Sequence, residues 1–112
     1  MPDDRRQVFL DNLVSGAAAH LPLAPGIKVC ALPAGNRPGL ALQIAREALQ
    51  AGQLQRALER RFEQAVAFDG CFIYLDAKGN LVIWHALPAT NATLDRILSR
   101  MLSLANLQTL DR

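Results

Sequence analysis

The sequence predicts an α+β fold in which a small antiparallel sheet is packed against helices. Three observations support this class: an apolar hairpin pattern at 71–87, a strand pattern at 27–32, and long amphipathic stretches beside them. The chain has 112 residues, of which 51% are hydrophobic and 20% charged, as is typical of a globular domain with one core. We therefore expect a single domain over residues 1–112, with its elements in the order helix, strand, helix, strand, strand, helix.

Residues 3–21 have the pattern of an amphipathic first helix. Asp3 and Asp4 lie at its start, where the helix dipole favours negative charge. Pro22 is expected to end this helix, because proline cannot continue the hydrogen-bond ladder. The following segment, 21–26, holds two prolines and a glycine, so the sequence predicts a stiff linker there.

Ile27 to Leu32 is the first predicted strand, with Lys28 facing solvent and apolar residues on its other side. Pro33 to Gly39 is rich in proline and glycine, which predicts a loop. Residues 40–43 either continue as a strand or enter the next helix, and we favour the helix.

The longest helical pattern covers 41–67, with apolar residues at helical spacing and mixed charges on the opposite face. Gly52 lies in its middle, where glycine costs up to ~1 kcal/mol relative to alanine. One bent helix and two helices that meet at Gly52 both fit this pattern. A last amphipathic helix is predicted from about Asn91 to Leu107, with more leucine than a single apolar stripe needs.

The segment from Phe68 to Pro88 gives the strongest structural signal in the chain. Two runs of β-branched and aromatic residues flank a turn sequence, Asp76 to Asn80, in which Gly79 suits a left-handed position. Placing Asp76 opposite Asn80 fixes the register of the two strands. The predicted cross-strand pairs are Leu75–Leu81, Tyr74–Val82, Ile73–Ile83, Phe72–Trp84 and Cys71–His85.

Both faces of this hairpin are apolar, although a hairpin with one wet side needs only one apolar face. One face holds Phe72, Tyr74, Val82 and Trp84, and aromatic residues are enriched at protein interfaces. We therefore predict that these four residues bind another protein. In the alternative arrangement the chain's own helices cover both faces, with the long helix on one face and the first and last helices on the other.

No catalytic, cofactor-binding or metal-binding set of residues is predicted. Cys71 beside His85 is the best candidate for a thiol enzyme, with Asp69 or Asp76 as the orienting acid. Both residues lie in mid-strand on an apolar face, which offers no cleft for a reactive thiol. We favour a buried, reduced cysteine in a cytosolic protein. The two cysteines and two histidines lack the short spacings of metal ligands.

The charge of the chain does not predict a nucleic-acid partner. The net charge is only +2, and the basic cluster of Arg56, Arg60 and Arg61 is interrupted by glutamates and has no aromatic platform beside it. The N-terminus is charged and every apolar run is too short to span a membrane. We therefore expect neither a signal peptide nor membrane insertion, and a cytoplasmic location.

The C-terminal part of the chain also resembles a known family. The residues Leu75-Asp76-Ala77-Lys78-Gly79-Asn80-Leu81-Val82 are followed by Trp84, by Leu87-Pro88 and by the amphipathic stretch from Leu94 to Leu107. Within residues 41–107, this order resembles the second half of small class I type III secretion chaperones. The resemblance implies helices packed on a twisted antiparallel sheet, assembled as a homodimer or heterodimer. It also implies binding of a secreted effector or gatekeeper in the bacterial cytosol without ATP.

Two features of this chain differ from that class of chaperones. Its members tend to have three strands between the first two helices, whereas this sequence predicts one clear strand there. They are also usually acidic, whereas this chain carries a net charge of +2.

The sequence thus predicts a bacterial protein-binding module without enzymatic activity, acting as a secretion chaperone or co-chaperone that shields an apolar segment. Its partner would be a secreted effector, a gatekeeper or a secretion-apparatus protein, held by the Trp84 face, by edge-strand pairing, or by both. Dimer contacts are predicted at Met101, Leu104 and Leu107. The alternative function is a small regulatory or scaffold module, similar to roadblock domains, and a thiol enzyme ranks below it.

Overall fold

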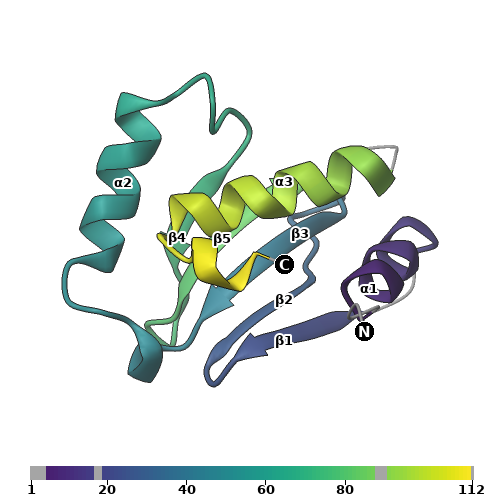
Figure 1. Cartoon of the computed structure of the whole chain (residues 1–112), viewed down its shortest axis with the longest axis horizontal. Coiled ribbons are helices and arrows are strands. Elements are labelled where there is room, and N and C mark those ends of the chain that lie inside the picture. The colour runs from purple at the N-terminus through teal and green to yellow at the C-terminus, as the bar shows by residue number, and fades with distance from the viewer. Residues whose placement is uncertain (1–4, 17–18, 88–90, 112) are drawn as a thin grey trace.

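The structure, a computed structural model, describes residues 5–16, 19–87 and 91–111 (Figure 1). Its elements follow one another as α1 (Arg5–Val14), β1 (His20–Ala24), β2 (Ile27–Ala31), β3 (Gly39–Ile44), the 3-10 helix η1 (Arg46–Ala48), α2 (Gln53–Glu63), β4 (Phe72–Leu75), β5 (Leu81–Ala86), α3 (Asn91–Leu104) and the 3-10 helix η2 (Gln108–Leu110). The strands form one five-stranded antiparallel sheet in the order β1-β2-β3-β5-β4. The predicted α+β class is therefore confirmed.

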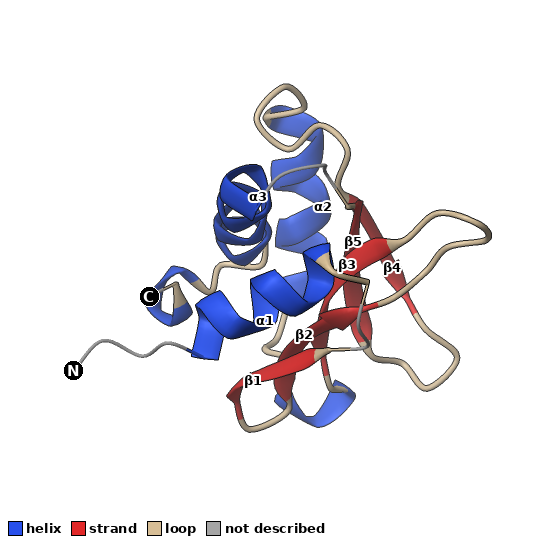
Figure 2. Cartoon of the chain, turned by 90° about the vertical axis from the view of Figure 1, so that its right-hand side faces the viewer, coloured by secondary structure: helices blue, strands red, loops and turns tan. Residues whose placement is uncertain are grey.

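The α-helices that the structure describes all lie on the same side of the sheet (Figure 2). The main core lies between these helices and the facing side chains of the strands. The arrangement with helices on both faces is not found in the described part of the chain. The main core includes buried residues from α1, from the strands and from α3: Phe9, Leu10, Leu13, Val29, Leu40, Leu42, Ile44, Leu81, Ile83, Leu94, Leu98, Met101 and Leu102.

The β4–β5 hairpin forms as the sequence predicts. The register pairs Leu75 with Leu81, Tyr74 with Val82, Ile73 with Ile83 and Phe72 with Trp84. The turn is closed by the backbone N–H of Asp76, which donates to the carbonyl of Asn80 at 3.0 Å. Gly79 has a φ of 84°, a left-handed conformation that glycine adopts without strain. Cys71 lies just before β4, so the predicted pairing of Cys71 with His85 is not part of the ladder.

The N-terminal segment differs from the prediction. The helix over residues 3–21 is too long, because α1 ends at Val14 and β1 begins at His20. The predicted linker at 21–26 is largely strand, with an irregularity in register between Pro22 and Ala24. Proline is tolerated here because β1 is an edge strand, which pairs with β2 alone and leaves one side without ladder bonds.

The segment 41–67 also differs, since it is not one helical stretch. Residues 40–43 do not form the expected helix but belong to β3, the middle strand of the sheet. Strands buried on both faces have no alternation of apolar and polar residues, so their pattern is easily confused with a buried helix. Gly52, with a φ of 75°, precedes α2 and separates it from η1. The region is therefore a strand, a 3-10 helix and an 11-residue α-helix.

The last helix is close to its predicted position of 91–107, and side chains of α2 bind its C-terminal end. Gln53 Nε2 donates to the carbonyl of Ala105 at 2.9 Å, and Arg60 Nη1 donates to the carbonyl of Ser103 at 2.6 Å. These bonds satisfy carbonyls that lack a partner within the helix. The chain then turns at Asn106, whose φ is 62°. Together these contacts fix α2 against α3 on the helical side of the sheet.

Arg6 connects α1 to α3 and to the C-terminal segment. Its Nε lies 2.8 Å from Asp95 Oδ1, and its Nη1 lies 2.6 Å from Asp111 Oδ1. Arg6 Nη2 also donates to Ser99 Oγ at 3.0 Å. The Arg6 side chain is only 15% exposed, so these charge-assisted bonds hold the first helix on the core.

Candidate protein-binding face

The face of the sheet opposite the helices carries the four residues predicted to bind another protein. The strand registers place its side chains in two rows that cross the sheet. Each row crosses all five strands and therefore spans four strand spacings of about 4.8 Å each. From β1 to β4, one row is Pro22, Lys28, Gln43, Val82 and Tyr74, and the other is His20, Cys30, Ala41, Trp84 and Phe72.

Trp84 is covered by the loop between β2 and β3. Its indole Nε1 donates to the carbonyl of Leu32 at 2.7 Å, and the Arg37 guanidinium carbon lies 5.8 Å from the ring centroid. A second, small apolar cluster forms here, in which Trp84 is 5% exposed and Val82 1% exposed. The loop therefore takes the place of a helix over part of this face, but only above Trp84 and its neighbours.

Phe72 and Tyr74 remain open to solvent beside this cluster. Phe72 is 56% exposed and Tyr74 is 42% exposed, and the Phe72 ring lies 6.0 Å from that of Trp84. A pocket of about 390 Å³ lies between these rings and the loop residues Pro33, Ala34 and Arg37. The structure thus brings Phe72, Tyr74 and Trp84 together around one groove, which we call the aromatic groove. Val82 is buried on the same face.

The strand that presents the aromatic groove is an edge strand. β4 pairs with β5 and with no other described strand. Natural edge strands are usually protected by charges, prolines or bulges, but β4 consists of Phe72, Ile73, Tyr74 and Leu75. An apolar, unprotected edge is suited to pairing with a further extended segment.

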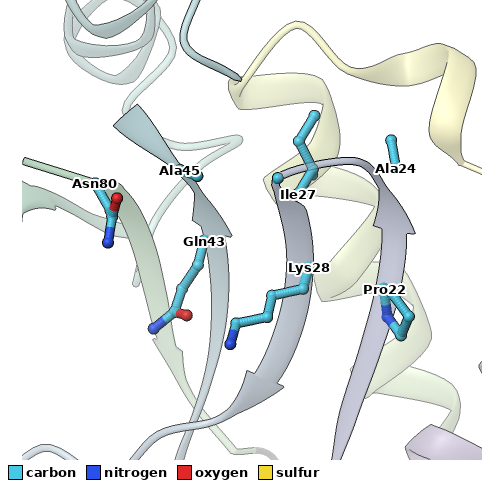
Figure 3. A pocket seen from close by; sticks show the side chains of 8 residues that line it. Pro22, Ala24, Ile27, Lys28, Gln43, Ala45 and Asn80 are labelled. Carbon is cyan, nitrogen blue, oxygen red and sulfur yellow. The ribbon is translucent and has the colours of Figure 1, made fainter. Parts of the chain in front are cut away.

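A second pocket lies at the other end of the same face and is more polar (Figure 3). Lys28 and Gln43, which are paired in the register of β2 and β3, extend side by side over the sheet, and Asn80 lies beyond them. The pocket has a volume of about 360 Å³. Its lining supplies one cation and two amides, which can bind polar groups of a ligand but include no nucleophile or general base.

A third hollow lies on the opposite edge of the sheet, between α1 and β1. It has a volume of about 540 Å³ and is lined by Val8 and Phe9 of α1 together with residues of β1. Val8 is 54% exposed. Like β4, β1 is an edge strand, so each edge of the sheet has an apolar hollow beside it.

Another apolar surface lies on α2 and the turn that follows it, on the apolar side of the helical pattern over 41–67. Leu58 is 47% exposed, Phe62 85% and Val66 93%. Their spacing of four residues places them on one side, as the sequence predicts, and the structure leaves this side exposed to solvent.

The residues predicted as dimer contacts lie in or against the main core rather than on an exposed surface. Met101 is 0% exposed and Leu104 is 1% exposed, because both belong to the main core. Leu107 is partly buried against the same core. Met101 and Leu104 are thus enclosed by the chain itself and offer no surface to a second chain, whereas Leu107 stays partly exposed.

Burial disfavours a reactive thiol at Cys71. Cys71 is 3% exposed, and burial raises the pKa of its thiol, although Arg61 and Arg100 oppose this effect and Asp69 adds to it. A raised pKa disfavours the nucleophilic thiolate. His85 Nδ1 is hydrogen-bonded to the Ala86 carbonyl at 2.7 Å. Within the described ranges, no group of three or more metal-binding side chains is found and no helix has the length and apolarity of a membrane span.

The Asp76 carboxylate organises the β4–β5 turn. Its Oδ1 accepts from the backbone N–H groups of Asn80 at 3.0 Å and Lys78 at 2.9 Å, and its Oδ2 accepts from Asn80 Nδ2 at 3.0 Å. The Asn80 backbone bond is the main cause that lowers the pKa of Asp76, and the Asn80 side chain and Lys78 act in the same direction. Asn80 Oδ1 in turn accepts from the backbone N–H of Arg46, which joins the turn to η1.

We expect this turn to make stability depend on pH. Because the folded pKa of Asp76 lies below its unfolded value, the contribution of the carboxylate is complete above about pH 4 and is lost as the pH falls through the folded pKa. Asp76→Asn should therefore lower the free energy of unfolding at neutral pH and make little difference at the acid end. Urea denaturation from pH 7 to pH 2.5 measures this. A deficit of equal size at every pH would contradict the proposed role of the charge.

The order of the elements and the family comparison together define the class of the protein. Three strands lie between α1 and α2, and the β4–β5 hairpin and α3 follow, as in the secretion chaperones that residues 41–107 resemble. The chain is a type III secretion chaperone-like protein. More specifically, it belongs to the HrpV-like family, which matches residues 3–110. The resemblance seen in the C-terminal part is thus confirmed, and the family match extends it to the N-terminal part.

Comparisons with curated proteins and with solved structures give two further results. No curated protein shows significant similarity to the chain. A chain in the structure of the HopA1–SchA chaperone–effector complex is 15% identical, with a TM-score of 0.49, and the alignment covers 95% of this chain and 94% of that chain.

Proposed function

We propose that the chain is a non-enzymatic, cytoplasmic component of a type III secretion system that binds and shields an apolar segment of another protein. The partner would be a secreted effector, a gatekeeper or a subunit of the secretion apparatus, and the chain would act as its chaperone or co-chaperone. The observation that carries this proposal is the exposure of Phe72 and Tyr74 beside Trp84, on a sheet face that no described helix covers. Membership of a secretion-related family supports the cellular context.

The aromatic groove provides a physical basis for binding. Aromatic side chains dominate the energetics of protein interfaces, and a few of them in a well-packed centre supply most of the affinity. Phe72 and Tyr74 present exposed rings, and Trp84 supplies a rigid wall because its indole is already bonded to Leu32. A partner segment that pairs with the edge of β4 would add main-chain hydrogen bonds to these side-chain contacts. The same segment would protect the apolar edge from aggregation.

A second copy of the chain, or a related subunit, is the proposed partner of α2. Phe62 and Val66 are almost fully exposed, and Leu58 continues their stripe. A stripe of this kind on a helix that otherwise carries mixed charges is typical of a helix that packs against another chain. This surface replaces Met101 and Leu104, which the core of the chain encloses. Dimerisation through α2 would leave the pocket beside Trp84 free, since none of its lining residues belongs to α2.

The double variant Phe72→Ser/Tyr74→Ser tests the binding function. Proteins that copurify with the wild-type chain from the native bacterium are identified by mass spectrometry, and their affinities for the variants are then measured with purified components. We expect the double variant to bind at least a hundredfold more weakly, since each ring is a hot-spot residue worth about 2 kcal/mol. The cost to the fold should be small, because both side chains are exposed.

Leu75→Ser is the matched control, because Leu75 lies on the same strand at 49% exposure but points to the opposite face. It should bind as the wild type does. Equal affinity of the double variant and the control would contradict a binding role for the aromatic groove. A partner that proves to be an enzyme or a GTPase, rather than a secretion protein, would indicate the regulatory module instead.

A further inference from the structure

We propose that the aromatic groove selects an extended partner segment in which an acidic residue stands two positions from a large apolar residue. This selectivity rests on the binding function proposed above and specifies the chemistry of the bound segment. Arg37 supplies the charge that would pair with the acid, and Phe72 and Tyr74 supply the apolar contact.

Arg37 is held at the groove by an ordered turn. The backbone N–H of Ala34 donates to the carbonyl of Arg37 at 2.9 Å, and the N–H of Arg37 donates to the carbonyl of Ala34 at 3.1 Å. The guanidinium carbon lies 5.8 Å from the centroid of the Trp84 ring, within the range of a cation–π contact. Within the described residues Arg37 has no carboxylate partner, and its side chain is exposed to solvent. The groove therefore holds a positioned cation that is open to an incoming acid.

The surrounding face is also free of competing acids. None of the residues in the five described strands is Asp or Glu. The acid that comes nearest in sequence to β4 is Asp76, and both of its oxygens are engaged in the turn by Lys78 and Asn80. A carboxylate on the partner thus meets a face of complementary charge, which favours correct pairing over other segments.

The order of the two residues follows from the two ends of the groove. Phe72 is paired with Trp84, so it lies at the end where Arg37 contacts the Trp84 ring. Tyr74 lies two residues further along β4, about 7 Å away in a strand. Burial is the main cause that raises the pKa of Tyr74, and the negative charge of Asp76 adds to it. That charge disfavours an acid at the Tyr74 end, so the apolar residue belongs there and the acid belongs beside Arg37.

The selectivity can be measured without knowing the natural partner. A library of random twelve-residue peptides displayed on phage is selected on the purified full-length chain and on three variants: Arg37→Glu, Lys28→Glu and Phe72→Ser. We expect the wild type to enrich peptides with Asp or Glu two positions from a Leu, Ile, Phe or Trp. Arg37→Glu should enrich Lys or Arg at that position instead. For a synthetic peptide of the wild-type consensus, it should lower the affinity at least about tenfold.

Lys28→Glu is the matched control, because it reverses a charge on the same face but lies outside the lining of the groove. It should keep the preference of the wild type. Enriched peptides that depend on Phe72 but show no acidic preference, or whose preference survives Arg37→Glu, would overturn the selectivity and leave the binding function standing. Failure to enrich any peptide whose binding depends on Phe72 would count against the binding function and the selectivity together.

Discussion

Gly39→Ala is expected to lower the free energy of unfolding by about 1–3 kcal/mol, as overpacking of a filled site does. A Cβ atom at residue 39 would overlap the indole of Trp84, with Nε1 as the nearest atom. Relief of this clash requires the ring to leave its place, which breaks its hydrogen bond to the Leu32 carbonyl. Urea denaturation followed by circular dichroism measures the loss. The fluorescence of Trp84, the single tryptophan of the chain, should shift to the red as the ring meets water.

A double-mutant cycle with Trp84→Phe separates this clash from a general effect of alanine at residue 39. The smaller phenyl ring lacks the atoms that the new Cβ would meet, so Gly39→Ala should cost much less in the Trp84→Phe background. An equal cost in both backgrounds would show that the indole is not the obstacle. The variant also bears on function, because Trp84 forms the wall of the aromatic groove. We expect a displaced ring to weaken partner binding even where the fold persists.

Met101→Ala is expected to lower the stability of the fold, and Phe62→Ala is expected to weaken association with another chain. Met101 is 0% exposed, so its truncation should cost about 2–5 kcal/mol of stability through the cavity that it leaves. Phe62 is 85% exposed, so its truncation should change stability by less than about 0.5 kcal/mol. We expect Phe62→Ala to weaken self-association or pairing with a related subunit, because that ring is the centre of the proposed α2 contact.

Denaturation curves and molar mass by light scattering distinguish the two variants. Met101→Ala should unfold at lower urea concentration, and Phe62→Ala should keep the wild-type midpoint but lower the mass of any oligomer at a given concentration. A wild-type chain that stays monomeric both alone and when mixed with a related subunit would contradict the proposed α2 contact. So would an unchanged oligomer in Phe62→Ala.

The hairpin could be predicted from the sequence because its signals are local. The turn from Asp76 to Asn80 fixes the register by its own chemistry, and the register decides which side chains share a face. Once Phe72 was placed opposite Trp84, the aromatic face followed without knowledge of the rest of the chain. The resemblance to secretion chaperones rested on the same residues.

The rest of the sheet depends on contacts between distant residues. β3 lies between β2 and β5 and is buried on both faces, so Leu40, Ala41 and Leu42 carry no alternation that distinguishes a strand from a helix. β1 contains Pro22, which local rules place in a linker, but an edge strand accepts proline. In both cases the tertiary environment overrides the local pattern.

The sequence predicts only part of the candidate site, because the rest of the site also depends on contacts between distant residues. The surplus of leucine in the last helix suggested an interface, yet Met101 and Leu104 lie in the core that α3 shares with the sheet and with α1. Conversely, Arg37 lies in a loop whose position over Trp84 depends on long-range contacts, such as the bond from Trp84 Nε1 to Leu32. No pattern in the sequence brings Arg37 to the aromatic groove.

Amide hydrogen exchange, measured on the chain alone and bound to its natural partner, tests the central claim most directly. Exchange reports the protection of individual backbone segments. If the aromatic groove and the edge of β4 hold the partner, binding should slow exchange at 72–75 and in the loop at 32–39. Protection confined to α1 and β1, or to α2, with no change at 72–75, would contradict the account.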